Sequence, residues 1–175
     1  MVESNIGYKR FRPFVGVPSR EIIVSHKSDK RSAEPAGNTT SERALPFKMP
    51  VAELIGFEIE EVVPGRAIIT LQTGPQHSNP MGTLHGGILC DIADAAMGIS
   101  IGSTLEPGQS FTTVELKINF FRPVWSTKLT AEGSVLQRGK TTAYVECVVK
   151  EEAGKLVAKA ASTCIILHGE RANGR

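Results

Sequence analysis

A glycine-rich segment that runs directly into a long apolar segment constrains this chain more than any other feature. Residues 77–87 read HSNPMGTLHGG, and residues 88–101 read ILCDIADAAMGISI. Asn79-Pro80 and Gly82 favour a bent, non-repetitive backbone. The apolar segment is rich in alanine and apolar on most sides, which is typical of a buried helix. We therefore predict a helix over residues 88–101 that is entered from a tight loop.

The start of this helix carries a chemical signal. Gly86 and Gly87 open it, so its first N–H groups have neither a partner in the helix nor a side chain that shields them. With the positive end of the helix dipole, such donors form a site for an oxygen that carries negative charge. Asp94 lies two turns further along, in a segment whose only other charge is Asp91. We expect Asp91 to be a solvated surface residue or a carboxylate paired with Lys or Arg. The segment therefore combines an anion site with a nearby carboxylate.

Length and composition are those of an ordinary globular protein. The 175 residues are enough for one compact domain, and the net charge of +2 gives no reason to expect nucleic acid or an anionic membrane as partner. The most apolar run carries two Asp and is too short to span a bilayer. Three scattered cysteines without zinc spacing are typical of reduced thiols. No secretory signal is evident, so we expect a cytoplasmic protein. No metal-binding motif is present, so we expect no metal site.

Composition divides the chain into three parts. We expect residues 1–45, rich in Ser, Pro, Lys and Arg, to form a partly disordered extension, residues 46–168 the folded domain, and residues 169–175 a polar tail. Within the domain the patterns predict a short helix, a hairpin, the long helix and a four-strand antiparallel meander. The predicted ranges are 47–55 for the short helix and 57–63, 67–72, 110–124, 129–137, 141–151 and 155–168 for the strands. In this α+β order a single sheet can curl around the long helix.

The strand predicted at 110–124 has a clean alternation of side chains. It predicts two faces, one with Thr112, Val114, Leu116, Ile118 and Phe120 and the other with Thr113, Glu115, Lys117 and Asn119.

The element order, together with the pattern Asn79-x2-Gly82-x2-His85-Gly86-Gly87-x6-Asp94, resembles the hotdog-fold acyl-CoA thioesterases of the phenylacetic-acid-degradation (PaaI-like) branch. The resemblance covers residues 47–168. It implies an antiparallel sheet curled around one central helix, and hydrolysis of acyl-CoA thioesters to the free acid and CoA. The Gly86 N–H would polarise the thioester carbonyl, while Asp94 of a second subunit would act as general base or nucleophile. The site would then lie at a dimer interface in a homodimer or homotetramer.

The same resemblance implies roles for the neighbouring residues. Asn79 and His85 would orient the water or the carbonyl, or brace the loop. A hydroxyl on the strand after the helix would hold the water, which points to Thr113, with Thr112 as an alternative. The remaining expected substrate contacts are Gly82 and Gly87 in the loop and, for the CoA pyrophosphate, Arg138, Gly139 and Lys140. No cofactor is implied, because CoA is part of the substrate.

Other functions were weighed against this one. Residues 98–102 read GISIG and match the G-x-S-x-G elbow of serine hydrolases, but that motif requires a strand before it and a helix after it. Hydratases of the same fold carry a His five residues after the Asp, where this chain has Ile99. A non-catalytic acyl-CoA sensor is disfavoured because it does not need a buried carboxylate. An acyl-carrier-protein thioester stays open as the substrate, as does the acyl group: aryl-acetyl, benzoyl or medium-chain.

Overall fold

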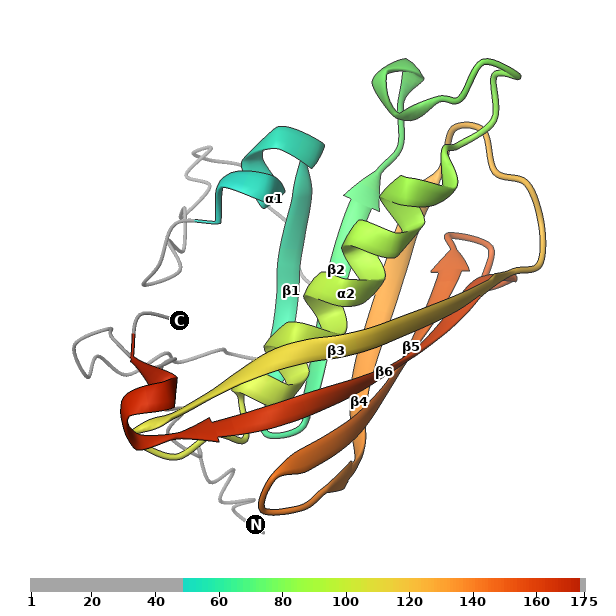
Figure 1. The fold of residues 1–175 in the computed structure, drawn as a ribbon. Helices are drawn as coiled ribbons and strands as arrows, with labels where there is room; N and C mark the ends of the chain where they lie inside the picture. Colours follow the sequence, from blue (N-terminus) through green and yellow to red (C-terminus); the bar gives the residue numbers. More distant parts are fainter. Residues whose placement is uncertain (1–48, 174–175) are drawn as a thin grey trace, which may run out of the picture.

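The computed structural model describes residues 49–173, and the expected extension over residues 1–45 lies outside them. Six strands and one long helix make up most of this part of the chain (Figure 1). In chain order the elements are α1 (Pro50–Ile55), β1 (Phe57–Val63), β2 (Arg66–Gln72), the short 3₁₀ helix η1 (Pro75–His77), α2 (Gly86–Gly102), β3 (Gln109–Phe120), β4 (Lys128–Arg138), β5 (Thr142–Glu151), β6 (Leu156–His168) and the 3₁₀ helix η2 (Gly169–Ala172).

The strands form one antiparallel sheet in the order β1-β2-β4-β5-β6-β3, which curls around α2 (Figure 1). This confirms the predicted α+β architecture. The prediction of a four-strand meander is wrong, because β3 pairs with β6 at the sheet edge and β4 pairs with β2. The physical reason lies in residues 121–127. This connection is too long for a tight turn and contains Pro123, which cannot donate to a strand ladder.

The connection is instead attached to the end of β2. The Thr73 N–H donates to the Thr127 carbonyl at 3.0 Å, and the Thr127 N–H donates to the Thr73 hydroxyl at 2.9 Å. These bonds deliver the chain to the open edge of β2, so β4 begins there. For the same reason β3 ends at Phe120 rather than at residue 124 as predicted.

The long helix begins two residues earlier than predicted and packs against the sheet along its buried side. Its buried residues are Leu89, Ile92, Ala93, Ala96, Met97, Ile99, Ser100, Ile101 and Gly102. Gly133 of β4 allows the close approach, because a Cβ at that position would overlap the Ala96 carbonyl of α2. Close packing of this kind leaves little freedom in how α2 lies on the sheet.

A β-bulge at Val114 interrupts β3. Thr113 pairs with Cys164 and Glu115 pairs with Thr163, so Val114 is the extra residue. Paired residues share a face, and Cys164 is buried on the side that faces α2. The predicted alternation is therefore wrong before the bulge. Thr113 lies on the inner face, the face that Leu116 occupies after the bulge.

The described part of the C-terminal tail forms a short helix. The 3₁₀ helix η2 follows β6 directly, and its Ala172 is buried, so the segment packs against the domain although its sequence is mostly polar.

Candidate active site

The start of α2 leaves one backbone donor without a partner. His85 is the N-cap residue, and its Nδ1 accepts a hydrogen bond from the Gly87 N–H at 2.9 Å. Within residues 49–173 the Gly86 N–H has no hydrogen-bond acceptor. The N–H groups of the two glycines are therefore not equivalent. Gly86 presents the free N–H at the positive end of the helix dipole.

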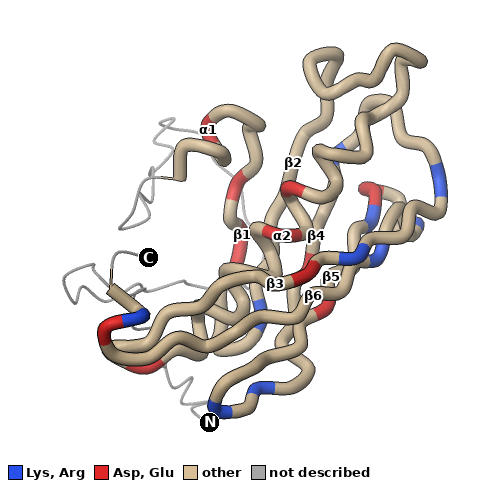
Figure 2. Tube along the Cα trace, viewed as in Figure 1, with Lys and Arg blue, Asp and Glu red and all other residues tan. Residues whose placement is uncertain are grey.

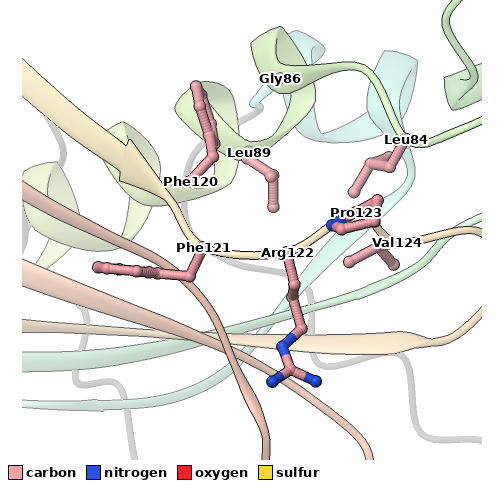
Figure 3. Close-up of a pocket in the computed structure, with 8 residues that line it drawn as sticks. All are labelled: Leu84, Gly86, Leu89, Phe120, Phe121, Arg122, Pro123 and Val124. Atoms are coloured by element: carbon pink, nitrogen blue, oxygen red, sulfur yellow. The ribbon is translucent and has the colours of Figure 1, made fainter.

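Gly86 also lines a pocket of about 480 Å³ (Figure 3). The ring of Phe120 lies against its backbone, since a Cβ at Gly86 would stand 3.1 Å from the Phe120 ring. The pocket is formed by the entrance to α2 and by the chain that leaves β3, and its lining residues are Leu84, Gly86, Leu89, Phe120, Phe121, Arg122, Pro123 and Val124. Its volume is in the range of small-molecule sites, roughly 300–1,000 Å³.

Asn79 uses its side chain within the loop that precedes the helix. Its Oδ1 accepts from the N–H groups of Met81 (2.9 Å) and Thr83 (3.2 Å), and its Nδ2 donates to the Thr83 hydroxyl at 2.8 Å. Gly82, with φ of +79°, supplies the left-handed turn that closes the loop. Of the two roles left open for Asn79, this geometry favours bracing the loop.

The buried side chain of His77 also anchors the loop, a role that the sequence did not predict. The Gly74 N–H donates to His77 Nδ1 at 3.0 Å, so Nε2 carries the proton and donates to the Ile55 carbonyl at 2.8 Å. His77 thereby connects the loop to the end of α1. Its position between a proline and the glycine-rich stretch gave no sequence signal for this role.

Asp94 and Thr113 form the second part of the site. The Thr113 hydroxyl lies 3.5 Å from Asp94 Oδ1 across the gap between β3 and α2. Thr112, the alternative, pairs with Ile165 on the other face of the sheet. The structure therefore brings Thr113, and not Thr112, to Asp94.

The environment of Asp94 differs from the buried carboxylate that the sequence analysis assumed. Its side chain is exposed in the single chain, although the Thr113 hydroxyl of the edge strand β3 lies beside it. Nearby protein atoms still remove part of its hydration, and this desolvation is the main reason why the pKa of Asp94 is raised above its usual value. The Thr113 hydrogen bond opposes this increase in pKa, and the negative charge of Asp91 adds to it.

Gly86 and Asp94 of one chain cannot serve one carbonyl group together. They stand eight residues apart on the same helix, which corresponds to about 12 Å of helix rise. A carbonyl that accepts from Gly86 and a water activated by Asp94 must meet within about 3 Å of each group. One chain therefore presents two half-sites.

The predicted pyrophosphate contacts lie far from the Gly86 pocket of the same chain. Arg138 Nη2 donates to Gln109 Oε1 at 2.6 Å, and His168 Nε2 donates to the Lys140 carbonyl at 2.8 Å. Gln109 is the first residue of β3 and Phe120 the last, so roughly 35 Å of strand separates the two regions. Figure 2 shows Lys and Arg at the β4–β5 turn, at the opposite end from the loop that enters α2. Gly139 belongs to this same turn.

Ser100 of the GISIG sequence is buried within α2 and donates to the Met97 carbonyl at 2.7 Å, so it is no serine-hydrolase nucleophile. The described residues hold no group of three side chains that could bind a metal ion. No helix over residues 49–173 is long and apolar enough to cross a membrane.

Comparison with known proteins decides the family. The family model described as the thioesterase superfamily matches residues 81–158, from the loop before α2 into β6. A Saccharolobus solfataricus protein named only as an esterase is 37% identical over 103 residues, which cover 59% of this chain and 73% of that protein. The chain belongs to the thioesterase superfamily.

Two further relatives are consistent with this assignment. The thioesterase is 29% identical over 109 residues to 1,4-dihydroxy-2-naphthoyl-CoA hydrolase of Listeria monocytogenes, covering 62% of this chain and 89% of that enzyme. The E. coli PaaI protein from the phenylacetic acid degradation operon superposes with a TM-score of 0.65 and 26% identity, covering 69% of this chain and 86% of that one. The hotdog fold, the PaaI-like branch and the enzyme class, a thioester hydrolase, are confirmed.

Proposed function

We propose that this thioesterase hydrolyses acyl-CoA esters at a site completed by two copies of the chain, with Gly86 from one copy and Asp94 from the other. The observation that carries the proposal is the Gly86 N–H at the edge of a pocket, which has no hydrogen-bond acceptor among residues 49–173. Relatives named as acyl-CoA hydrolases support CoA esters as the substrate class. CoA is then a substrate, and the reaction uses neither a metal nor a cofactor.

In the proposed reaction the thioester oxygen accepts the Gly86 N–H bond. A water held by the Thr113 hydroxyl attacks the carbonyl carbon while Asp94 takes its proton, and negative charge develops on the oxygen that faces Gly86. A preorganised donor at that point is worth about 3 kcal/mol of activation free energy. The tetrahedral intermediate then releases the CoA thiolate, which recovers the proton from Asp94. In a variant of this mechanism, the Asp94 carboxylate attacks the carbonyl carbon directly, and no water takes part in that first step.

A free sheet edge offers the place for the second copy. Among the described residues β3 pairs only with β6, so one side of this twelve-residue strand has unpaired backbone groups. Val114 is 59% exposed on this strand. Long exposed edges with apolar side chains are usually covered in soluble proteins. We infer that a partner copy covers β3 and brings its Asp94 to the Gly86 of the first copy; two such dimers would give a tetramer.

The β4–β5 turn has a role in the same arrangement. Because Arg138 and Lys140 are remote from the Gly86 of their own chain, we propose that they meet the CoA pyrophosphate of a substrate bound in another copy. Arg138 Nε has no hydrogen-bond partner in the described part of the chain, and Lys140 is exposed. The three cysteines, all free, are compatible with a reducing cytoplasm as the location.

The first test is release of CoA thiol from acyl-CoA esters by the wild type and by Asp94→Asn. We expect a loss of about 10³-fold in kcat, with a melting temperature no lower than that of the wild type as the folding control. An Asp94→Asn variant with wild-type activity would show that another group activates the water.

The second test addresses the two-copy site. Gly86→Pro and Asp94→Asn are each expected to be inactive alone, while hybrids that contain one chain of each keep one intact pair of Gly86 and Asp94. We expect activity to return when the differently tagged chains are co-expressed and the hybrid is purified. Inactive hybrids would overturn the sharing of the site between copies.

A further inference from the structure

Ser162 of β6 is a buried serine that the proposed reaction does not use. It has no solvent-exposed surface, and it precedes Cys164 by two residues, so its side chain lies on the same face of the sheet, towards α2. Its Oγ donates a hydrogen bond to the Glu115 carbonyl of β3 at 2.8 Å. Since β6 and β3 are neighbouring strands (Figure 1), this bond ties β6 to the edge strand.

The accepting carbonyl stands at the β-bulge of β3. Glu115 directly follows the extra residue Val114, and Thr113 directly precedes it. A bulge disrupts the backbone ladder locally, so a side-chain bond between the two strands at this point adds to what holds the bulge in place. The same bulge points Thr113 at Asp94, with 3.5 Å between the hydroxyl and Oδ1.

Cys164 lies between the two hydroxyls. Its Sγ is 3.8 Å from Ser162 Oγ, and because the Ser162 proton goes to the Glu115 carbonyl, the thiol is the donor in this contact. Burial raises the pKa of the Cys164 thiol, and the hydroxyls of Ser162 and Thr113 oppose this increase. The thiol is therefore protonated at neutral pH and takes no part as a nucleophile.

We propose that Ser162 is a positioning residue for hydrolysis, because its bond to β3 fixes the bulge. The bulge in turn fixes the Thr113 hydroxyl beside Asp94. The inference rests on the proposed function, which assigns Thr113 and Asp94 to the attacking water. Ser162 is too deeply buried to touch substrate. It acts only through Thr113, so its removal cannot cost more activity than removal of the Thr113 hydroxyl.

A second route from Ser162 to Thr113 would run through the Cys164 thiol instead of the backbone of the bulge. In that case, replacing the thiol would disturb Thr113 as much as replacing the Ser162 hydroxyl. In our proposal, Cys164→Ala leaves the bond from Ser162 to Glu115 in place, so Thr113 keeps its position. The two variants therefore separate the two routes.

The experiment measures the pH dependence of kcat/KM with the best substrate among acetyl-, hexanoyl-, benzoyl- and phenylacetyl-CoA. In Ser162→Ala we expect the acid limb to move to higher pH, as in Thr113→Val, because the hydrogen bond that holds down the pKa of Asp94 is weakened. The plateau should fall by about three- to tenfold. Adding Ser162→Ala to Thr113→Val should change neither the limb nor the plateau further, since the two residues act in series.

Ser100→Ala is the matched control. It deletes another serine hydroxyl that is fully shielded from solvent and donates to a backbone carbonyl, that of Met97 in α2. Its acid limb and plateau should be those of the wild type. Among the described residues the titratable groups that interact with Asp94 are Asp91 and Cys90 of α2 and Cys164 of β6, and neither serine variant removes any of them.

Hydrogen exchange gives a reading that does not require turnover. The amides of residues 114–116 should exchange faster in Ser162→Ala than in the wild type or in Ser100→Ala, because the bulge opens more often. Unchanged exchange at these amides contradicts the fixing of the bulge by Ser162.

Each kinetic outcome has one meaning. An acid limb that stays at the wild-type position in Ser162→Ala overturns the inference, even if the variant is less stable. An equal shift in Cys164→Ala overturns it in favour of the thiol route, and additive losses in the double variant show that Ser162 does not act through Thr113. Absence of turnover with all four esters by the wild type contradicts the proposed function itself.

Discussion

The hydroxyl of Thr113 lies 3.5 Å from the carboxylate of Asp94, and a one-residue bulge at Val114 puts it there. In an unbulged strand Thr113 would share the outer face with Glu115. The bulge turns it inward, to the face that α2 covers. Bulges near reactive sites commonly redirect a side chain in this way. Asp94 therefore has a hydrogen-bond partner within its own chain, although its side chain is exposed in the single chain.

The first prediction concerns the pH dependence of hydrolysis. The pKa of Asp94 is raised by desolvation, and the Thr113 hydrogen bond holds it down. Thr113→Val removes that bond, so the pKa rises further and the ionised base appears only at higher pH. We expect the acid limb of the kcat/KM profile to move to higher pH and the plateau to fall by about tenfold, because the water loses a positioning group.

Thr113→Ser is the matched control, because it keeps the hydroxyl. Its acid limb should stay at the wild-type position. An acid limb that does not move in Thr113→Val would show that Asp94 is not the group whose ionisation controls the rate.

The second prediction concerns the stability of Asp94→Asn. A carboxyl whose pKa is raised in the folded state binds its proton more tightly when folded, so the free energy of unfolding falls as the pH rises from the unfolded pKa through the folded pKa. Above that range the ionised form opposes folding. Asp94→Asn should therefore be at least as stable as the wild type at pH 7, with the difference vanishing in acid below the unfolded pKa. Urea unfolding at pH 7 and at a pH below the unfolded pKa measures this difference. A variant that is less stable than the wild type at pH 7 would contradict a raised pKa of Asp94 in the folded state.

The third prediction isolates the Gly86 N–H. Proline is tolerated at the first helical position, and His85, at φ −67° and ψ 132°, has the extended backbone that precedes a proline. Gly86→Pro thus deletes the donor while the helix can still begin at the same residue. We expect a loss of about 10²–10³ in kcat.

Gly86→Ala serves as the control, because it adds a Cβ beside Phe120 and keeps the N–H. The ring is the end of a side chain and can move by a few tenths of an ångström, so only a modest loss is expected. Equal losses in the two variants would attribute the effect to crowding rather than to the donor. Circular dichroism checks that the helix content is the same in both variants.

The fourth prediction concerns the contact between α2 and β4. Gly133→Ala forces a methyl group against the Ala96 carbonyl, a backbone atom that cannot move without the helix. We expect a loss of about 3 kcal/mol in the free energy of unfolding. Gly98→Ala, on the same helix, meets only the Phe111 ring at 3.4 Å and should be neutral or stabilising by up to about 1 kcal/mol. Chemical denaturation of both variants compares them directly, and equal stabilities would refute the close-approach argument.

The fifth prediction concerns the buried histidine beneath the loop. His77→Phe keeps an aromatic ring but leaves the Gly74 N–H and the Ile55 carbonyl without partners. Unpaired groups of this kind cost about 1–3 kcal/mol each, and the loop that enters α2 should become more protease-sensitive. His168→Phe, which removes an exposed bond to the Lys140 carbonyl, should cost less than about 1 kcal/mol. If the two substitutions lower the free energy of unfolding by the same amount, His77 does not anchor the loop.

The sequence by itself determined the elements and the chemistry at the start of the helix. Local signals are sufficient for these features. The turn at Pro64-Gly65, the loop through Gly82 and the apolar run after Gly87 act over a few residues, and their backbone preferences do not depend on distant neighbours. The spacing from Gly86 to Asp94 is likewise readable along one helix.

Only the tertiary structure decided which strands are neighbours and which side chains meet. The pairing of β3 with β6, the bulge at Val114 and the placement of Thr113 against Asp94 depend on contacts between residues far apart in the chain. The same holds for Arg122, whose place beside the Gly86 pocket follows from where β3 ends against α2. The alternation of side chains along a sequence does not reveal a one-residue bulge. The register of a strand is set by its pairing with the neighbouring strand and not by the alternation itself.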